Sequence, residues 1–223
     1  MNPIRSITKE SEIIGNKVTI EVLKPQHVAG ATACIAATFA KGEPMSQLLG
    51  ISLEEFTHFA RLFIEKTAQE GLSVVAVNEQ GKVIGVTVAE DYTTDPPAGL
   101  ETISEKFNPI FALLEALGEQ YTSRYDVAPG THYHIFMCGV YQEYANQRLA
   151  QKLNLFAENI ARERGYKATI CEATGRISQF VCFHQLGMES VDEIDYHTFQ
   201  LAGERVFSEI TSVDSCVVYH KVL

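Results

Sequence analysis

The stretch from 131 to 164 carries the clearest chemical signal in the sequence. A continuous apolar run at 131–141, THYHIFMCGVY, suits a central strand, and the residues from 145 to 164 follow it with the spacing of an amphipathic helix. A helix that begins directly after a strand exposes its first backbone N–H groups at the sheet edge, together with the positive end of its dipole. This arrangement predicts an anion site suited to a pyrophosphate.

The charges around this helix are consistent with such a site. Between positions 148 and 176 six basic residues stand against three acidic ones, in a chain whose net charge is −10. The basic residues are Arg148, Lys152, Arg162, Arg164, Lys167 and Arg176. A crossover helix with a solvated basic face would give the same pattern, so both interpretations stay open.

Histidines and cysteines offer weaker candidates. His132 and His134 lie on one face of the predicted strand because alternate residues of a strand point the same way. Without a third ligand in register they give little support for zinc, and a substrate-pocket role or polar filling of the strand's start explains them as well. Cys138 or Cys182 would suit a thiol nucleophile, although buried structural cysteines are commoner. We therefore expect no metal site.

The elements before residue 91 follow from periodicity and capping signals. Alternating valines and isoleucine predict a strand at 16–23, and a helical repeat after Pro25 predicts a helix that ends near Gly42. Ser52 and Glu55 form a capping box ahead of a helix that carries Phe56, Phe59 and Phe63 and that ends at Gly71. Two valine-rich runs within 73–90 predict a hairpin.

The second half adds an insertion and further strands. Residues 91–130 contain a predicted helix, with Asn108 as N-cap and Pro109 in its first turn, and we interpret them as an insertion packed on the domain. A strand at 167–173, a short helix at 175–186 and strands near 189–200 and 213–222 complete the chain. The fold class is α/β: a mixed central sheet flanked by helices, with a helical insertion between strands 3 and 4, in a single domain over 1–223.

The sequence resembles the GNAT superfamily of N-acetyltransferases over about residues 16–90 and 131–223. That family ends a strand with Val-x-Pro-x-Tyr and follows it with an Arg/Gln-x-x-Gly-x-Gly/Ala turn and a helix. Its further signature is Leu-Gly-Phe. The matching residues here are Val140, Tyr144, Leu149, Ala150, Leu153 and Leu186-Gly187-Met188.

Three further segments resemble the arylalkylamine (dopamine-type) subgroup. They are Glu43-Pro44-Met45, then Glu172-Ala173-Thr174-Gly175 with Ser178-Gln179, and Glu193-Ile194-Asp195-Tyr196. The resemblance implies direct transfer of an acetyl group from acetyl-CoA to a small primary amine, with proton handling by Glu43, Thr174 and Ser178. Because Thr174 and Ser178 are four residues apart, one helical face would present both. A loop carboxylate for Glu43 and helix capping for the hydroxyls are the plain alternatives.

The resemblance also implies which residues hold the coenzyme. They are Cys138, Gly139, Val140, Ala145, Asn146, Gln147, Arg148, Leu149, Ala150 and Ser178. Backbone N–H groups around Cys138–Val140 would polarise the thioester carbonyl. The two glycines of the turn are replaced here by Asn146 and Arg148, and an arginine tolerates a left-handed backbone poorly. Its side chain must swing aside or itself touch phosphate.

Two more departures bear on the reaction. Many relatives have a tyrosine acid four residues before the glycine of the Leu-Gly-Phe element, where this chain has Phe183. Residues 90–126 contain eight acids against Lys106 and Arg124, which would favour a cationic acceptor if they lined its pocket and would otherwise form a solvated acidic surface.

The composition of the chain limits the classes of binding partner that we expect. The acidic balance, 28 acidic against 18 basic residues, argues against nucleic acid and anionic membranes, and no apolar stretch approaches the roughly 18 residues of a membrane span. Five scattered cysteines without a CxxC pair predict reduced thiols in the cytoplasm. We expect a monomer or homodimer that is an acyltransferase. The alternative is a non-catalytic module of the same fold that binds acyl-CoA or nothing.

Overall fold

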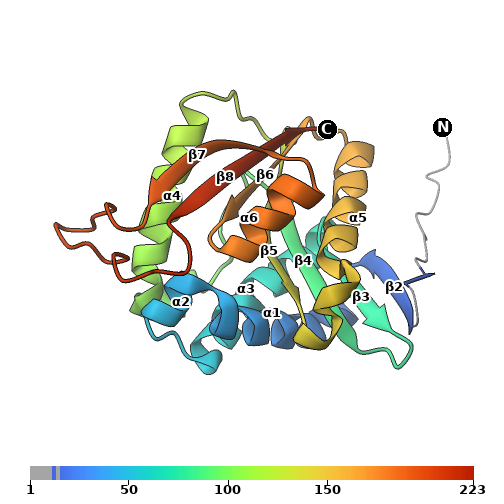
Figure 1. Cartoon of the computed structure of the whole chain (residues 1–223). Coiled ribbons are helices and arrows are strands. Elements are labelled where there is room, and N and C mark those ends of the chain that lie inside the picture. Colours follow the sequence, from blue (N-terminus) through green and yellow to red (C-terminus); the bar gives the residue numbers. More distant parts are fainter. Residues whose placement is uncertain (1–11, 14–15) are drawn as a thin grey trace.

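The structure is a computed structural model that describes residues 12–13 and 16–223 (Figure 1). The strands are β1 (Glu12–Ile13), β2 (Asn16–Val22), β3 (Val74–Asn78), β4 (Val83–Asp91), β5 (His132–Val140), β6 (Ala168–Ala173), β7 (Glu189–Asp195) and β8 (Ser215–Val222). The α-helices are α1 (Val28–Gly42), α2 (Pro44–Leu48), α3 (Leu53–Glu70), α4 (Asn108–Thr122), α5 (Leu149–Arg164) and α6 (Arg176–Phe180). Short 3₁₀ segments include Pro25–His27, Leu100–Thr102, Glu105–Phe107 and Gln142–Gln147, and a π-helical turn, Val181–Gln185, follows α6.

One eight-stranded sheet, in the order β1-β2-β3-β4-β5-β6-β8-β7, takes strands from both halves of the chain. Among the described strands β5 and β6 form the one parallel pair, and it extends only from His132 opposite Ala168 to His134 opposite Ile170. Beyond these three pairs the two strands separate, while β5 remains paired to β4 as far as Val140. The sheet is therefore split between β5 and β6.

Helices cover both faces of the sheet (Figure 1). On one face α1 and α3 pack together around Ile35, Phe59 and Ile64, and α4 joins the same core. On the other face α5 packs through Leu153 and Ala157 against β3, β4 and β5. In Figure 1, α6 lies in front of the strands between α5 and α4. Burial of these two apolar layers stabilises the sheet that carries the split.

The local signals confirm most of the predicted elements. Ser52 caps α3 in a capping box with Glu55, and Gly71 ends that helix with a left-handed φ of 68°. The hairpin over 73–90 is β3–β4, with Gly81 at φ 76° in its turn. The mixed α/β sheet with a helical insertion after the hairpin is confirmed as well.

Several predicted boundaries are wrong. The helix expected from 145 begins at Leu149, because a 3₁₀ segment and a left-handed Arg148 precede it. The N-cap of α4 is Phe107 instead of Asn108, because the 3₁₀ turn Glu105–Phe107 runs directly into the helix. The five-residue α2 was not expected, and the strand predicted at 189–200 ends at Asp195.

Within the described residues, no helix combines the length and the apolar character needed to cross a bilayer.

Candidate functional site

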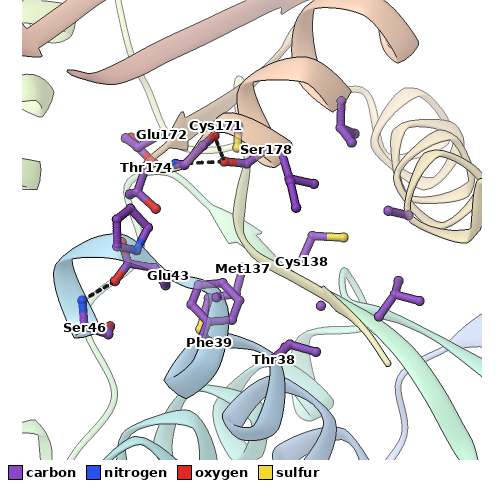
Figure 2. Close-up of a pocket in the computed structure, with 18 of the residues that line it drawn as sticks. Thr38, Phe39, Glu43, Ser46, Met137, Cys138, Cys171, Glu172, Thr174 and Ser178 are labelled. Atoms are coloured by element: carbon purple, nitrogen blue, oxygen red, sulfur yellow. Dashed lines mark hydrogen bonds between the residues drawn. The ribbon is translucent and has the colours of Figure 1, made fainter. Parts of the chain in front are cut away.

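A cavity of about 1350 Å³ passes through the split between β5 and β6. It is lined on one side by α1, α2, α3 and α4, and on the other by the start of α5 and by α6. Figure 2 shows Glu43, Thr174 and Glu172 along one side of it, and Cys138 across from them. We call the part bordered by α1–α4 the acceptor half and the part bordered by α5 and α6 the donor half.

Aromatic side chains form most of the wall of the acceptor half. The Phe59 ring stacks on Phe107 with centroids 4.7 Å apart, and Phe63 lies behind it against Phe136 at 4.5 Å. The phenylalanines that line the acceptor half are Phe39, Phe56, Phe59, Phe107, Phe111 and Phe136. This wall suits an apolar or aromatic body of a ligand.

The insertion contributes to this wall, but not with its acids. Residues 107–114 of the insertion line the cavity through Phe107, Ile110, Phe111 and Leu114. Of the eight acidic residues of 90–126, none lines the cavity, so the hypothesis that they form an acidic acceptor pocket is wrong. The helical repeat of α4 turns its apolar face to the core and leaves its two acids, Glu115 and Glu119, exposed.

Glu43 brings a carboxylate to the acceptor half. It follows α1 with an extended backbone, φ −89° and ψ 120°, as expected before Pro44. Its two carboxylate oxygens accept hydrogen bonds from the backbone N–H groups of Met45, at 3.1 Å, and Ser46, at 2.6 Å. Glu43 is therefore a buried N-cap of α2 that also lines the cavity.

Glu172 brings a second carboxylate, which sequence reasoning did not select as a site residue. It lies near the end of β6, lines the cavity, and accepts a hydrogen bond from the His134 ring over 2.7 Å. The available signal was an acid in the apolar strand KATICEA, since an ionised group in a buried strand requires a partner.

Thr174 and Ser178 both line the cavity but not from one helical face, so that prediction is wrong. Thr174 lies in the loop between β6 and α6, and its carbonyl accepts a hydrogen bond from the Tyr196 hydroxyl. Ser178 lies inside α6, where its hydroxyl donates to the Gly175 carbonyl at 2.8 Å and accepts from the Gly175 N–H at 3.1 Å (Figure 2). In the described residues the Thr174 hydroxyl has no hydrogen bond, so Thr174 has the freer proton donor.

The donor half begins at the exposed edge of β5. Past His134 this edge has no strand partner from β6, so alternate backbone N–H groups over Met137–Val140 face the split. Cys138, Gly139 and Val140 line the cavity there, as the sequence predicts. Burial raises the pKa of the Cys138 thiol to about 11, in spite of hydrogen bonds to Thr87 and Asn154. A thiol in this state is a poor nucleophile at neutral pH.

The predicted pyrophosphate turn has an unusual backbone. Residues Gln142–Gln147 form a 3₁₀ segment, in which successive N–H groups bond to carbonyls three residues earlier, as Tyr144 does to Tyr141. Arg148 follows with φ 54°, a left-handed conformation that glycine adopts at less cost. The position therefore keeps a glycine-like backbone although it holds an arginine.

The side chains of this turn divide into two groups. Ala145, Arg148 and Ala150 line the cavity, whereas the side chain of Leu149, the first residue of α5, is fully buried in the core, so that Leu149 has only its backbone to offer a ligand. Asn146 and Gln147 lie within the 3₁₀ segment, and none of the described residues forms a hydrogen bond with the buried amide oxygen of Gln147. The N–H groups of Leu149, Ala150 and Gln151 precede the first helical hydrogen bond of α5, which runs from Lys152 to the Arg148 carbonyl. Together with the side chains of Arg148 and Arg176, which line the cavity, this helix start fits a phosphate.

The two histidines of β5 have separate surroundings. His132 lies beside Tyr121 and His220, and His134 lies between Glu90 and Glu172. Neither lines the cavity. In the part of the chain that the structure describes, no group of three His, Cys, Asp or Glu side chains is arranged to hold a metal ion.

Comparison with known proteins places this geometry in a known fold. No protein-family model and no curated protein matches the sequence. The C-terminal condensation domain of Ebony, solved in complex with beta-alanyl-dopamine, superposes with a TM-score of 0.83 at 17% identity, over 93% of this chain and 100% of that one. Arylalkylamine N-acetyltransferase 2 from Aedes aegypti gives 0.76 at 22% identity, over 93% and 99%. Drosophila melanogaster polyamine N-acetyltransferase gives 0.74 at 17%, over 93% and 100%.

This chain has the GNAT fold. The fold resemblance from the sequence is thereby confirmed, and it includes the strands on both sides of the split. In this GNAT fold the residues expected to act on protons, Glu43, Thr174 and Ser178, all border one cavity together with Cys138–Val140. Phe183, at the position of the missing tyrosine acid, lies half exposed in the π-helical turn and does not line that cavity.

Proposed function

We propose that this protein is an N-acetyltransferase that moves an acetyl group from acetyl-CoA to a small primary amine in one direct step. The observation that supports this most is the cavity through the split. It joins an aromatic half with two carboxylates, Glu43 and Glu172, to a half bordered by Arg148, Arg176 and the open edge of β5. The acids suit a cationic amine and the arginines suit phosphates.

The donor half fits the coenzyme in part through side chains. Arg148 and Arg176 would contact its phosphates, and the thioester arm would lie beside the open edge of β5 at Cys138–Val140. Ile177 and Phe180, exposed apolar residues of α6 that line the cavity, would cover the arm. Acetyl-CoA supplies an activated acyl group, and the N–H groups over Cys138–Val140 would donate to the oxyanion of the acyl carbonyl.

Proton handling completes the reaction. The amine nitrogen forms a bond to the acyl carbon while the carbon–sulfur bond breaks. Glu43, directly or through water, takes the proton that the ammonium group loses before attack. The nitrogen loses a second proton as the amide forms, and the Thr174 hydroxyl would pass that proton to the leaving thiolate, so that it ends protonated as it began. Direct transfer needs no thiol nucleophile, and the raised pKa of Cys138, about 11, supports that mechanism. We also propose a cytoplasmic location, which the five free cysteines support.

A second candidate is an amine-condensing domain whose acyl donor is not acetyl-CoA. Two observations favour it: Asn146 and Arg148 replace the two glycines of the turn, and the Ebony condensation domain superposes with a TM-score of 0.83. A non-catalytic module that only binds acyl-CoA is the further alternative.

One experiment separates these three. Thiol release from acetyl-CoA is measured with a panel of amines (2-phenylethylamine, tyramine and 1,4-diaminobutane), alongside the melting temperature with acetyl-CoA. An enzyme shows turnover and, at about 100 times the Kd, a stabilisation of roughly 2.7 kcal/mol. Stabilisation without turnover supports the binding module. If acetyl-CoA produces neither turnover nor stabilisation, acetyl-CoA is not the acyl donor, and the condensing domain is favoured.

A further inference from the structure

A buried row of charged side chains leads from α3 to the wall of the cavity. Lys66 Nζ lies 2.7 Å from Glu90 Oε2, and Glu90 Oε1 lies 3.6 Å from His134 Nδ1. His134 Nε2 in turn lies 2.7 Å from Glu172 Oε2. The four side chains are at most 18% exposed. Because the signs alternate along the row, each carboxylate has a cationic neighbour, which offsets the cost of burying the charges.

The imidazole in this row is charged at neutral pH. Burial by itself would lower the pKa of His134, but Glu172 and Glu90 on either side raise it to about 10. Both ring nitrogens then carry protons, one directed to each carboxylate. Tyr92 packs edge-on against the ring at 5.3 Å, and Phe136 closes it from the cavity side of β5. The imidazole therefore has a fixed orientation.

The Glu172 carboxylate is held by one oxygen and open at the other. Oε2 accepts from His134, whereas Oε1 has no hydrogen bond among the described residues, and the residue lines the cavity. Both oxygens of Glu43, in contrast, are engaged by the N–H groups of α2. Of the two carboxylates of the acceptor half, Glu172 is thus the one with an oxygen that has no hydrogen bond among the described residues.

We propose that Glu172 binds the cationic nitrogen of the acceptor and that His134 is the positioning residue that holds this carboxylate toward the cavity. The inference rests on the proposed function and adds its specificity-determining residue. An ammonium group that leaves water for an aromatic pocket needs a counter-charge, and a charge-assisted hydrogen bond to Oε1 provides it. Glu43 then takes the proton from the nitrogen that Glu172 has positioned.

The first test is a comparison of KM and kcat in Glu172→Gln. For the amine of the panel above that wild type acetylates fastest, we expect the KM to rise by about 10- to 150-fold, the equivalent of a charge-assisted hydrogen bond of 1.5–3 kcal/mol. The KM for acetyl-CoA should stay unchanged, since Glu172 lies outside the donor half. An unchanged amine KM in Glu172→Gln overturns the proposal.

Two histidine variants test the positioning role. His134→Gln should raise the amine KM less than Glu172→Gln does, and the double variant should resemble Glu172→Gln alone, because His134 acts through that carboxylate. His132→Gln is the matched control: it is on the same strand and similarly buried, but it has no contact with Glu172. Equal effects of the two histidine variants, or additive effects in the double variant, would show that His134 only supports the fold.

A measurement on wild type alone covers the case in which the variants fail to fold. Calorimetry compares binding of 2-phenylethylamine with that of 2-phenylethanol, which has the same ring without the charge. We expect at least about tenfold tighter binding of the amine, the difference that one charged hydrogen bond provides. Equal binding of the two compounds contradicts the proposal that Glu172 binds the cationic nitrogen. Acetyl transfer as the function remains supported in that case if turnover is seen. If no amine of the panel is acetylated and none binds, both the proposed acetyltransferase function and the role of Glu172 are contradicted.

Discussion

The carboxylate of Glu43 accepts a hydrogen bond from the backbone N–H of Ser46 over 2.6 Å, and this contact fixes a candidate proton acceptor at the N-terminus of a helix. Glu43→Gln removes the basicity and retains the size of the side chain. We expect kcat/KM for amine acetylation to fall by roughly 10²–10⁴-fold at neutral pH, the usual contribution of a general base. The loss should shrink at high pH, where the amine is already neutral.

Helix capping needs its own control in this variant. An amide has one acceptor oxygen, so glutamine cannot keep both bonds to Met45 and Ser46, and a lost cap costs about 1 kcal/mol. Ser52→Ala removes a comparable cap from α3. If Ser52→Ala lowers kcat/KM as much as Glu43→Gln does, stability and not proton transfer explains the effect.

The two hydroxyls near α6 should behave differently. Thr174→Val removes a hydroxyl that has no hydrogen bond to any residue the structure describes, and we expect kcat to fall by about 10²-fold or more if this hydroxyl protonates the leaving thiolate. Ser178→Ala removes a hydroxyl already bonded to Gly175, and its main effect should be a melting temperature lower by the loss of one capping contact. Steady-state kinetics and thermal unfolding of both variants check this. Equal kcat losses would contradict the distinction.

Arg148 offers a prediction in which stability and binding change in opposite directions. Arg148→Gly relieves a left-handed backbone at φ 54°, so the free energy of unfolding should rise by about 1 kcal/mol, or roughly 2–4 °C for a chain of this size. The same change removes a guanidinium from the donor half, and coenzyme A binding should weaken by about 1.5–3 kcal/mol.

Arg148→Ala is the companion variant. It should lose the same affinity without the gain in stability, because alanine keeps the backbone strain. Tighter coenzyme A binding by Arg148→Gly would instead mean that the arginine obstructs the phosphates.

The elements that the sequence predicts best are those with local signals. The capping box at Ser52, the hairpin around Gly81 and the helical repeat of α1 depend on residues close in the chain, and each is confirmed. The start of α5 is not predicted correctly, since nothing in the local pattern reveals that Arg148 takes a left-handed backbone.

In the site, too, features that depend on residues distant in the chain are not predicted from local patterns. Glu43, Thr174 and Ser178 were indicated by resemblance to a family, and their shared cavity results from long-range packing of α2 and α6 about the split. The ion pair of His134 with Glu172 joins residues 38 positions apart on neighbouring strands, so periodicity within either strand does not show it. The sequence indicates His134 as a candidate for the substrate pocket and Glu172 as part of a family-like segment, but it does not indicate that the two side chains pair.

The charged row containing His134 gives a pH dependence of stability whose sign is defined. The pKa of His134 is about 10 in the folded protein and has an ordinary value of 6.5. Between these values the folded chain retains a proton that the unfolded chain releases. The stabilisation is therefore complete below pH 6.5 and is lost as the pH rises toward 10, by up to about 1.4 kcal/mol per pH unit.

Chemical unfolding of wild type and His134→Gln is measured from pH 6 to 10, and the unfolding free energies of the two proteins are subtracted at each pH. Titrations elsewhere in the chain contribute nearly equally to both proteins and therefore mostly cancel. The difference in unfolding free energy should shrink as the pH rises. The groups that face the imidazole are Glu90, Glu172 and Tyr92, and burial keeps the pKa of Tyr92 above this range. His132→Gln is the control, because burial lowers the pKa of His132 and its difference should stay flat above pH 6.5. A difference for His134→Gln that is equally flat would show that the imidazole is neutral between the two carboxylates.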